Sequence, residues 1–399
     1  MKKLILLLFF FSSLSFAAIT PEELANLTIE RTPLIKANLE ELAALSKQIN
    51  QSNLWKNPSL VMQTGRARTG RDFGYVMDLT LMQNVPWPGA LEVLKRQSEI
   101  TRDLTELSVK QAELRLYHLA LLLGLELSSL EKIDALNRLR RKRLDGISNY
   151  IKAKVVVSDN DRIEAGMIQN QILMVDNFIF DIETRIKKLK IKLKRLTGIE
   201  ITSVQLFEGA LPKISREALL EELGSSPEWK IRKKKVQFAK EEVKRVQYET
   251  KPELEFGLNY RVEHLRPENE FVHANIGVTL PLWDRGQYRD QVANARLRRE
   301  EALSKVSEIT IMDRFDETYQ KIEYSYFQSD SFKLSNIGQL ESKIRKAEEA
   351  FKKGRITAVT LLQYDDQIQQ NMNATYFSRY EFYSYLADMY EMLGKKMKL

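Results

Sequence analysis

The sequence contains one pattern twice, and this duplication restricts the fold more than any other feature. Pro227 and Pro252 lie 194 residues after two earlier prolines, Pro33 and Pro58. After both Pro58 and Pro252, two strand-like segments precede a long helical pattern. Self-similarity at a fixed spacing indicates that one structural unit occurs twice along the chain.

Each repeat is predicted to contain a helix, two strands, a long helix and a returning helix. The first repeat covers 18–198, with strands at about 59–66 and 73–85 and long helices at about 90–151 and 158–197. The second covers 215–394, with strands at about 253–263 and 270–281 and long helices at about 285–353 and 357–393. The remaining segments are a signal peptide (1–17), a connector (199–214) and a tail (395–399).

The stretch from Phe271 to Gln287 indicates how a strand leads into a helix. Its apolar residues alternate with polar or small ones, and a period of two predicts a strand with one apolar and one polar face. Pro281 cannot donate to a sheet ladder, so the strand is expected to end there. Asp284, followed three residues later by Gln287, is interpreted as a capping box that opens the helix.

The long helices carry the signature of coiled coils. Helix 90–151 would be about 90 Å long and helix 285–353 about 100 Å long, too long to pack on an ordinary globular domain. Apolar residues in the returning helix of the first repeat recur in steps of four and three, which predicts a coiled-coil seam. Its members are Ile168, Ile172, Val175, Ile179, Ile182, Ile186, Leu189, Leu193 and Leu196.

The N-terminus and the composition indicate an exported protein. Lys2 and Lys3 precede an apolar core, and Ser15–Ala17 fits a cleavage site. The absence of cysteine excludes disulfides, thiolate metal sites and a lipid anchor on an N-terminal cysteine. The net charge is +8, and the basic residues are spread along the helices. Because the sequence has no motif of a nucleic-acid-binding domain, no nucleic-acid partner is expected.

The strands are long enough to cross a bilayer when tilted, which takes roughly 9–11 residues. A single four-stranded sheet would leave two open edges in lipid, so insertion requires oligomerisation. Two copies would supply eight strands and three would supply twelve, both compatible with closed bacterial barrels. A soluble sheet packed on a core is the alternative, but its polar face suits a wet lumen. The lumen-facing candidates are Asp78, Glu253, Glu255, Asn259, His273 and Asn275.

Several motifs, taken in order, resemble the TolC-type family of outer-membrane efflux proteins across the mature chain. Asn57-Pro58-Ser59-Leu60 and Lys251-Pro252-Glu253-Leu254 resemble the family's pre-strand segments. The junction Leu280–Gly286 is nearest to the heavy-metal and cation efflux branch. Phe351-x-x-Gly354-x-x-Thr357 and Ser158-x-x-Asp161 resemble the turns at the far ends of the long helices. At the turn before Ser158, the family usually has Gly, whereas this chain has Ala153-Lys154.

The resemblance implies a mainly α fold with a membrane β-barrel, assembled as a homotrimer. Twelve strands would form one barrel in the outer membrane of a Gram-negative bacterium, continued by an α-helical tunnel in the periplasm. The tunnel tip would dock a periplasmic adaptor and an inner-membrane RND or ABC transporter. The tip candidates are Ser158, Asp161, Gly354 and Thr357, and the barrel–tunnel junction candidates are Pro86, Gly89, Pro281 and Gly286.

The sequence shows no pattern typical of a catalytic or metal-binding site. His118, His264 and His273 share no metal-ligand spacing, and no catalytic or phosphate-binding motif occurs, so neither an enzyme nor a cofactor is expected. His118 is expected to pack among the leucines of a helix seam. Packing between helices is expected for Tyr376, Tyr380, Phe382, Tyr383 and Tyr385.

Three aspartates lie near the predicted tips: Asp161, Asp365 and Asp366. They either constrict the closed tunnel or have no role in it. In the second case Asp161 is an acid favoured at a helix N-terminus by the dipole, and the other two are solvated surface residues. Trp87 and Trp283 suit either an interfacial belt or a buried structural role.

The predicted function is passive conduction of efflux substrates. A type I secretion duct of the same family and a periplasmic coiled-coil adaptor or scaffold are the alternatives.

Overall fold

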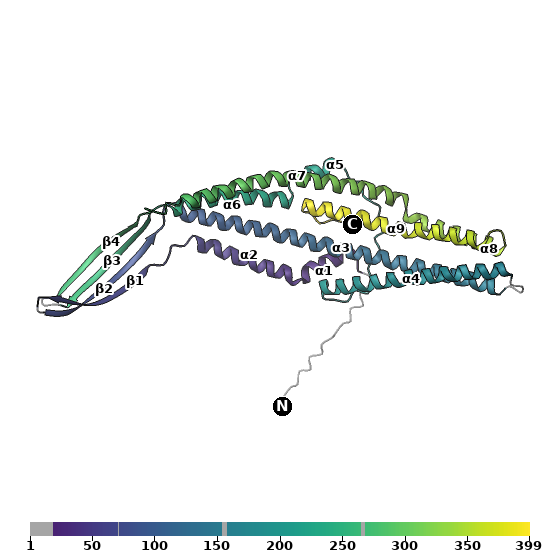
Figure 1. Cartoon of the computed structure of the whole chain (residues 1–399), viewed down its shortest axis with the longest axis horizontal. Coiled ribbons are helices and arrows are strands. Elements are labelled where there is room, and N and C mark those ends of the chain that lie inside the picture. Colours follow the sequence, from purple (N-terminus) through teal and green to yellow (C-terminus); the bar gives the residue numbers. More distant parts are fainter. Residues whose placement is uncertain (1–18, 71, 154–157, 265–267) are drawn as a thin grey trace, which may run out of the picture. The chain divides into compact units, whose positions relative to one another are not determined.

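The computed structural model describes residues 19–70, 72–153, 158–264 and 268–399 (Figure 1). The predicted signal peptide therefore lies outside the described residues, as do Lys154 and Val155–Val157 of the first helix turn. The described chain forms two compact units, and three of the boundaries between them fall inside helices. Unit 2 comprises Lys36–Lys110 and Gly224–Asp313, and unit 1 comprises the rest.

Unit 2 contains the whole sheet. Its strands are β1 (Ser59–Thr69), β2 (Asp72–Val85), β3 (Glu253–His264) and β4 (Asn269–Thr279). They form one antiparallel sheet and lie side by side in sequence order, β1-β2-β3-β4 (Figure 1). The helices of this unit are most of α2 (Pro33–Ser52), all of α6 (Pro227–Glu249), and the first parts of α3 (Ala90–Lys152) and α7 (Gln287–Ser331).

The strand register separates an apolar sheet face from a polar one. Residues that lie opposite each other in an antiparallel ladder share a face. One apolar row runs Met62, Leu79, Tyr260, Val272, and the next runs Leu60, Leu81, Leu258, Ala274. All of these residues except the partly buried Leu79 are exposed; Met62 is 61% exposed and Val272 is 75% exposed. The sheet thus presents an uncovered apolar surface.

Unit 1 is a helical bundle. It holds α1 (Pro21–Arg31), α4 (Asp159–Thr197), α5 (Arg216–Leu223), η1 (Leu334–Asn336), α8 (Ile337–Lys352) and α9 (Ala358–Leu393), with the later parts of α3 and α7. One buried cluster includes Leu127, Ile133, Leu193 and Ile368, and the connector joins it through Val204, which bridges to Ile19. None of the described helices has a stretch both long and apolar enough to span a bilayer.

The predicted mainly α fold with two strands in each repeat is confirmed. Two details of the sequence interpretation were wrong. The helix expected over 285–353 is interrupted, because α7 ends at Ser331 and a short 3₁₀ turn precedes α8. Ser, Asp and Asn are dense there (Ser329-Asp330-Ser331, Ser335-Asn336), and these residue types have low helix propensity because their side chains can bond to the backbone. Ser331 Oγ does so at the end of α7, donating to the Phe327 carbonyl at 2.9 Å.

The second error concerns the start of α7. Asp284 and Gln287 do not form a capping box, since α7 begins only at Gln287. Instead Asp284 Oδ1 accepts a bond from the Gly286 N–H at 2.9 Å, and Gln287 Oε1 accepts one from the Arg285 N–H at 3.0 Å. The Gly286 carbonyl then accepts the first helical bond, from Asp290 N at 2.8 Å. The acid shapes a turn before the helix rather than capping the helix itself.

Candidate functional site

The six lumen-facing candidates lie on one face of the sheet. Asp78 is opposite Arg261, Asn259 is opposite His273, and Asn275 and the two glutamates follow at alternate positions of the same face. Asn259 Nδ2 donates to Thr80 Oγ1 at 2.7 Å across the β2–β3 pair. The His273 ring stacks on Phe271 at a centroid distance of 5.8 Å. This face is therefore polar and hydrogen-bonded, in contrast to the apolar opposite face.

The four junction candidates lie where strands end and long helices begin. Gly89 and Gly286 adopt left-handed φ angles of 87° and 72°, which favour glycine over other residues. A Cβ on Gly89 would lie 2.6 Å from the Tyr248 hydroxyl, and one on Gly286 would lie 1.9 Å from Thr250 Cγ2. Both junctions therefore approach the end of α6 closely, and only glycine fits there.

Pro86 and Pro281 have the simpler role of ending the ladder. β2 stops at Val85, immediately before Pro86, and β4 stops at Thr279, two residues before Pro281. Proline has no N–H to donate to a neighbouring strand, so the ladder cannot continue through it.

Ser158 and Asp161 form a capping box at the start of α4. Ser158 Oγ accepts from Asp161 N at 3.2 Å, and Asp161 Oδ2 accepts from Ser158 N at 3.0 Å. The Ser158 hydroxyl also donates to the same carboxylate oxygen at 2.7 Å. Asp161 is buried. Its carboxylate therefore has a defined structural task in starting the helix.

Gly354 and Thr357 make the turn between α8 and α9. Gly354 has a φ of 68°, with bonds from Gly354 N to Phe351 O and from Arg355 N to Ala350 O, the pattern of a Schellman motif. Thr357 caps α9 by accepting from Thr360 N at 3.3 Å. Each of these tip residues thus defines where a long helix stops or starts.

The two turns lie at the same end of unit 1. The Ala358 N–H donates to Glu164 Oε1 at 3.4 Å, and Tyr150 Oη donates to the Lys352 carbonyl at 2.8 Å. Beneath them one buried cluster joins the ends of four helices. Its members include Ile151 of α3, Ile168 of α4, Phe351 of α8 and Leu361 of α9.

A buried ionic cluster, which the sequence interpretation missed, ties α9 to α3 and α8. Arg140 Nε donates to Asp365 Oδ2 at 2.6 Å, and both side chains are below one-tenth exposed (7% and 5%). Arg143 Nη2 donates to the other oxygen of Asp365 at 3.2 Å. The remaining members are Asp366, 3.1 Å from Arg140, and Glu348, 3.4 Å from Arg143. Burial raises the pKa of Glu348, although Arg143 opposes this effect.

The interpretation of Asp365 as solvated surface was therefore wrong, while Asp366 is partly exposed and bonded. The sequence contains a signal that could have indicated the cluster. The buried residues of α3 follow steps of four and three through Ile133, Asn137, Arg140, Leu144, Ile147 and Ile151. Arg140 occupies a seam position of a coiled coil, where a charge needs a partner on the facing helix.

His118 is buried, as expected from its neighbours, but it also has a polar task. Its Nε2 accepts a bond from the Met397 N–H at 3.1 Å, and burial lowers its pKa from 6.5 to about 4. Tyr117 Oη donates to the Met397 carbonyl at 3.1 Å. The segment after α9 is thereby fixed against α3.

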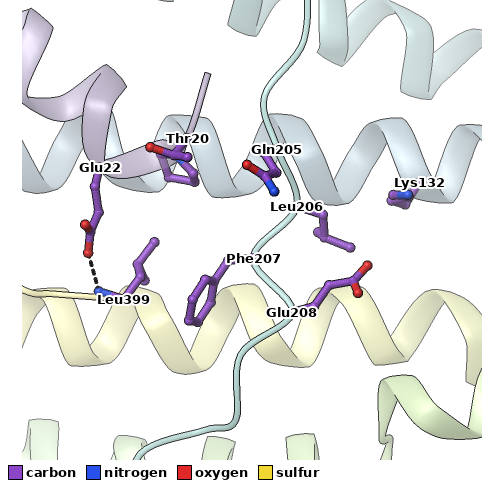
Figure 2. A pocket seen from close by; sticks show the side chains of 9 residues that line it. Thr20, Glu22, Lys132, Gln205, Leu206, Phe207, Glu208 and Leu399 are labelled. Carbon is purple, nitrogen blue, oxygen red and sulfur yellow. Dashed lines mark hydrogen bonds between the residues drawn. The ribbon is translucent and has the colours of Figure 1, made fainter. Parts of the chain in front are cut away.

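A cavity of about 580 Å³ lies beside this segment, where the connector passes. Figure 2 shows Gln205–Glu208 of the connector along it, and the Leu399 N–H bonded to Glu22 Oε1 at 2.6 Å. Of the aromatic residues expected to pack, Tyr376, Phe382 and Tyr383 are buried. The Tyr383 ring lies edge-on to Phe207 of the connector at a centroid distance of 5.6 Å. Across the described parts of the chain, no three His, Asp or Glu residues are arranged to hold a metal ion.

The fold and these features define a class of protein: a duplicated chain with an amphipathic strand pair and a long helical hairpin in each repeat. No protein-family model matches the sequence, and no curated protein matches it in sequence. Solved structures do match in fold. CusC, described in a study of transmembrane channel formation, superposes with a TM-score of 0.76 at 10% identity, covering 96% of each chain.

Two further structures agree. The outer membrane protein VceC from Vibrio cholerae gives a TM-score of 0.74 at 12% identity, covering 95% of this chain and 97% of VceC. The Campylobacter jejuni CmeC outer membrane channel gives 0.75 at 14% identity, covering 95% and 89%. The chain therefore has the fold of TolC-type outer-membrane channels, which confirms the predicted resemblance at the level of fold.

Proposed function

We propose that this protein is an outer-membrane channel that passively conducts efflux substrates out of a Gram-negative cell. Three copies would close one twelve-stranded barrel, and the long helices would form the periplasmic tunnel. A periplasmic adaptor and an inner-membrane RND or ABC transporter would supply the substrate and the energy. The likeness in fold to outer-membrane channels supports this proposal.

The observation that carries it is the sheet of unit 2. One face is apolar and exposed, the other is polar, and the outer strands β1 and β4 each pair with one strand among the described residues. In lipid such edges must be paired. Because β1 and β4 run in opposite directions, β4 of one copy can pair antiparallel with β1 of the next, and a ring of copies then has no edge.

We assign adaptor docking to the turns at the end of unit 1. Gly354 and Thr357 lie on the exposed turn between α8 and α9, and Ser158 begins α4 next to them. The ionic cluster around Asp365 would keep α9 against α3 in the closed tip. Adaptor binding would favour an arrangement in which these helices separate.

A periplasmic adaptor or scaffold is the less suitable function. That class would carry lipoyl-like or barrel modules between its helices, whereas the described residues between α2 and α3 and between α6 and α7 form the four-strand sheet. A secretion duct would share the present fold, and neighbouring genes for an ABC exporter would distinguish it from an efflux channel.

Extraction and conductance test the proposal. The full chain should require detergent, run as a trimer by light scattering, and conduct ions in planar bilayers. A monomer that stays in solution without detergent refutes the channel. A deletion strain tested against metals, dyes and antibiotics would then identify the substrate class.

A further inference from the structure

Three of the four tryptophans gather at one end of the sheet. We call this end the foot: β1 and β3 begin there, and β2 and β4 end there. Trp55 precedes β1, Trp87 follows β2, and Trp283 follows β4, each within four residues of its strand. Trp283 is 88% exposed and Trp55 is 55% exposed. Tryptophan is enriched at the level of lipid headgroups, where a ring can be half apolar and half wet.

A cavity of about 620 Å³ lies at the foot, entirely within unit 2. We call it the foot pocket. Its walls are the Trp55–Lys56 loop, Trp87, and the end of α6 with Tyr248 and Lys251. Trp87 Nε1 donates to the Pro252 carbonyl at 2.7 Å, which fixes that wall. Gln83 Nε2 donates to the Lys56 carbonyl at 2.9 Å, which holds the loop in place. The pocket is thus built from anchored segments.

Four cations and two carboxylates, Glu249 and Glu253, line the foot pocket, so its charge is net positive. Glu249 pairs with Arg245. Arg245 is paired with Glu242 at 2.6 Å, and Arg289 with Asp284 at 3.0 Å. Lys56 and Lys251, by contrast, pair with no carboxylate among the residues that the structure describes. The Lys251 ammonium lies 4.3 Å from the Tyr248 ring centroid and 5.4 Å from that of Trp87. Two cations thus remain available beside apolar aromatic walls.

We propose that the foot pocket binds the phosphate of an anionic phospholipid headgroup. Lysine binds phosphate as a point charge, and the aromatic walls suit the glycerol and upper acyl region. The apolar sheet face ends at this level, with Val85 and Leu254 among its last rows. A lipid standing along that face would therefore bring its headgroup to Lys56 and Lys251. This inference rests on the proposed function, which places the sheet in a membrane.

The test compares short-chain lipids on the purified full-length protein in detergent. Native mass spectrometry would count bound dihexanoyl-phosphatidylglycerol against dihexanoyl-phosphatidylcholine at matched concentrations. A lysine near an anionic headgroup contributes about a fivefold gain in affinity. The variant Lys56→Gln/Lys251→Gln should therefore lose roughly twenty-five-fold in affinity for phosphatidylglycerol. Lys240→Gln/Lys305→Gln, which removes two exposed lysines of the same unit away from the pocket, should bind like the unaltered protein.

Equal binding of the two lipids, or an equal loss in both double variants, overturns the proposal. Displacement of phosphatidylglycerol by inorganic phosphate at similar concentration would show a free-anion site and overturn the lipid assignment. Rescue by Lys56→Arg/Lys251→Arg supports a charge-based site rather than a change of fold. Channel conductance in phosphatidylcholine bilayers is measured separately, so failure of the proposed function is distinguished from failure of this inference.

Discussion

Removal of the Asp365 carboxylate is expected to loosen α9 locally. In Asp365→Ala, Arg140 keeps only the partly exposed Asp366 as a partner in a site where its own side chain is 7% exposed. Breaking a buried ion pair on one side costs about 3–5 kcal/mol. Because Asp366 still lies 3.1 Å from Arg140, we expect the lower end, about 3 kcal/mol. That corresponds to roughly a hundredfold increase in local opening.

Amide hydrogen exchange measures this opening directly. Residues 361–369 of α9 should lose about two orders of magnitude of protection. Arg140→Leu/Asp365→Leu replaces the pair by apolar groups and should recover protection to within about 1 kcal/mol. Asp366→Ala, which removes an exposed partner, should cost at most about 1 kcal/mol. Unchanged exchange in Asp365→Ala, or a double variant as loose as the single one, would refute the reasoning.

Three further changes test other parts of the structure. The pKa of His118 is lowered to about 4, so the unfolded chain binds a proton at this residue more tightly than the folded protein does. The neutral His118 ring therefore contributes its full stabilisation above about pH 6.5, and this contribution is lost as the pH falls towards 4. The variant His118→Gln keeps a hydrogen-bond acceptor that does not titrate. Hydrogen-exchange protection in this variant should therefore change less between pH 7 and 4.5 than in the unaltered protein. Gly286→Ala should sharply reduce the yield of folded protein, because its Cβ would overlap Thr250 Cγ2, and adding Thr250→Ser should restore part of it; an unchanged yield for Gly286→Ala alone contradicts this. Met62→Lys on the apolar face should reduce membrane insertion by about 2–4 kcal/mol, while the adjacent Gln63→Lys on the polar face should not; equal effects in a liposome-insertion assay would contradict the assigned faces.

Much of the fold could be predicted because its signals are local. The alternation through Phe271–Thr279 fixes a strand and its two faces, and the 4-3 spacing from Ile168 to Leu196 fixes a coiled-coil helix. Both periodicities follow from backbone geometry and need no knowledge of neighbours. The duplication added the second strand pair, and the strand count indicated oligomerisation before any pairing was known.

Tertiary structure decided how separate segments meet. The strand order β1-β2-β3-β4 brings Asp78 and Arg261 opposite each other although 183 positions separate them. Arg140 lies in a basic run of the sequence, and only the packing of α9 places Asp365 against it. No local pattern encodes such partners, because the cost of burying a charge is met by a residue from a distant segment.

Some turns could likewise be predicted from local sequence, whereas others depend on tertiary contacts. Gly354 and Thr357 could be read as a helix stop and start, since Schellman and capping signals are local. The requirement for glycine at position 286 could not be predicted from local sequence, because it arises from contact with Thr250, which follows α6. By itself the sequence determined most of the elements and which faces are apolar, although not the break between α7 and α8. The tertiary structure alone decided which residues those faces bring together, because contacts between distant segments depend on packing rather than on local periodicity.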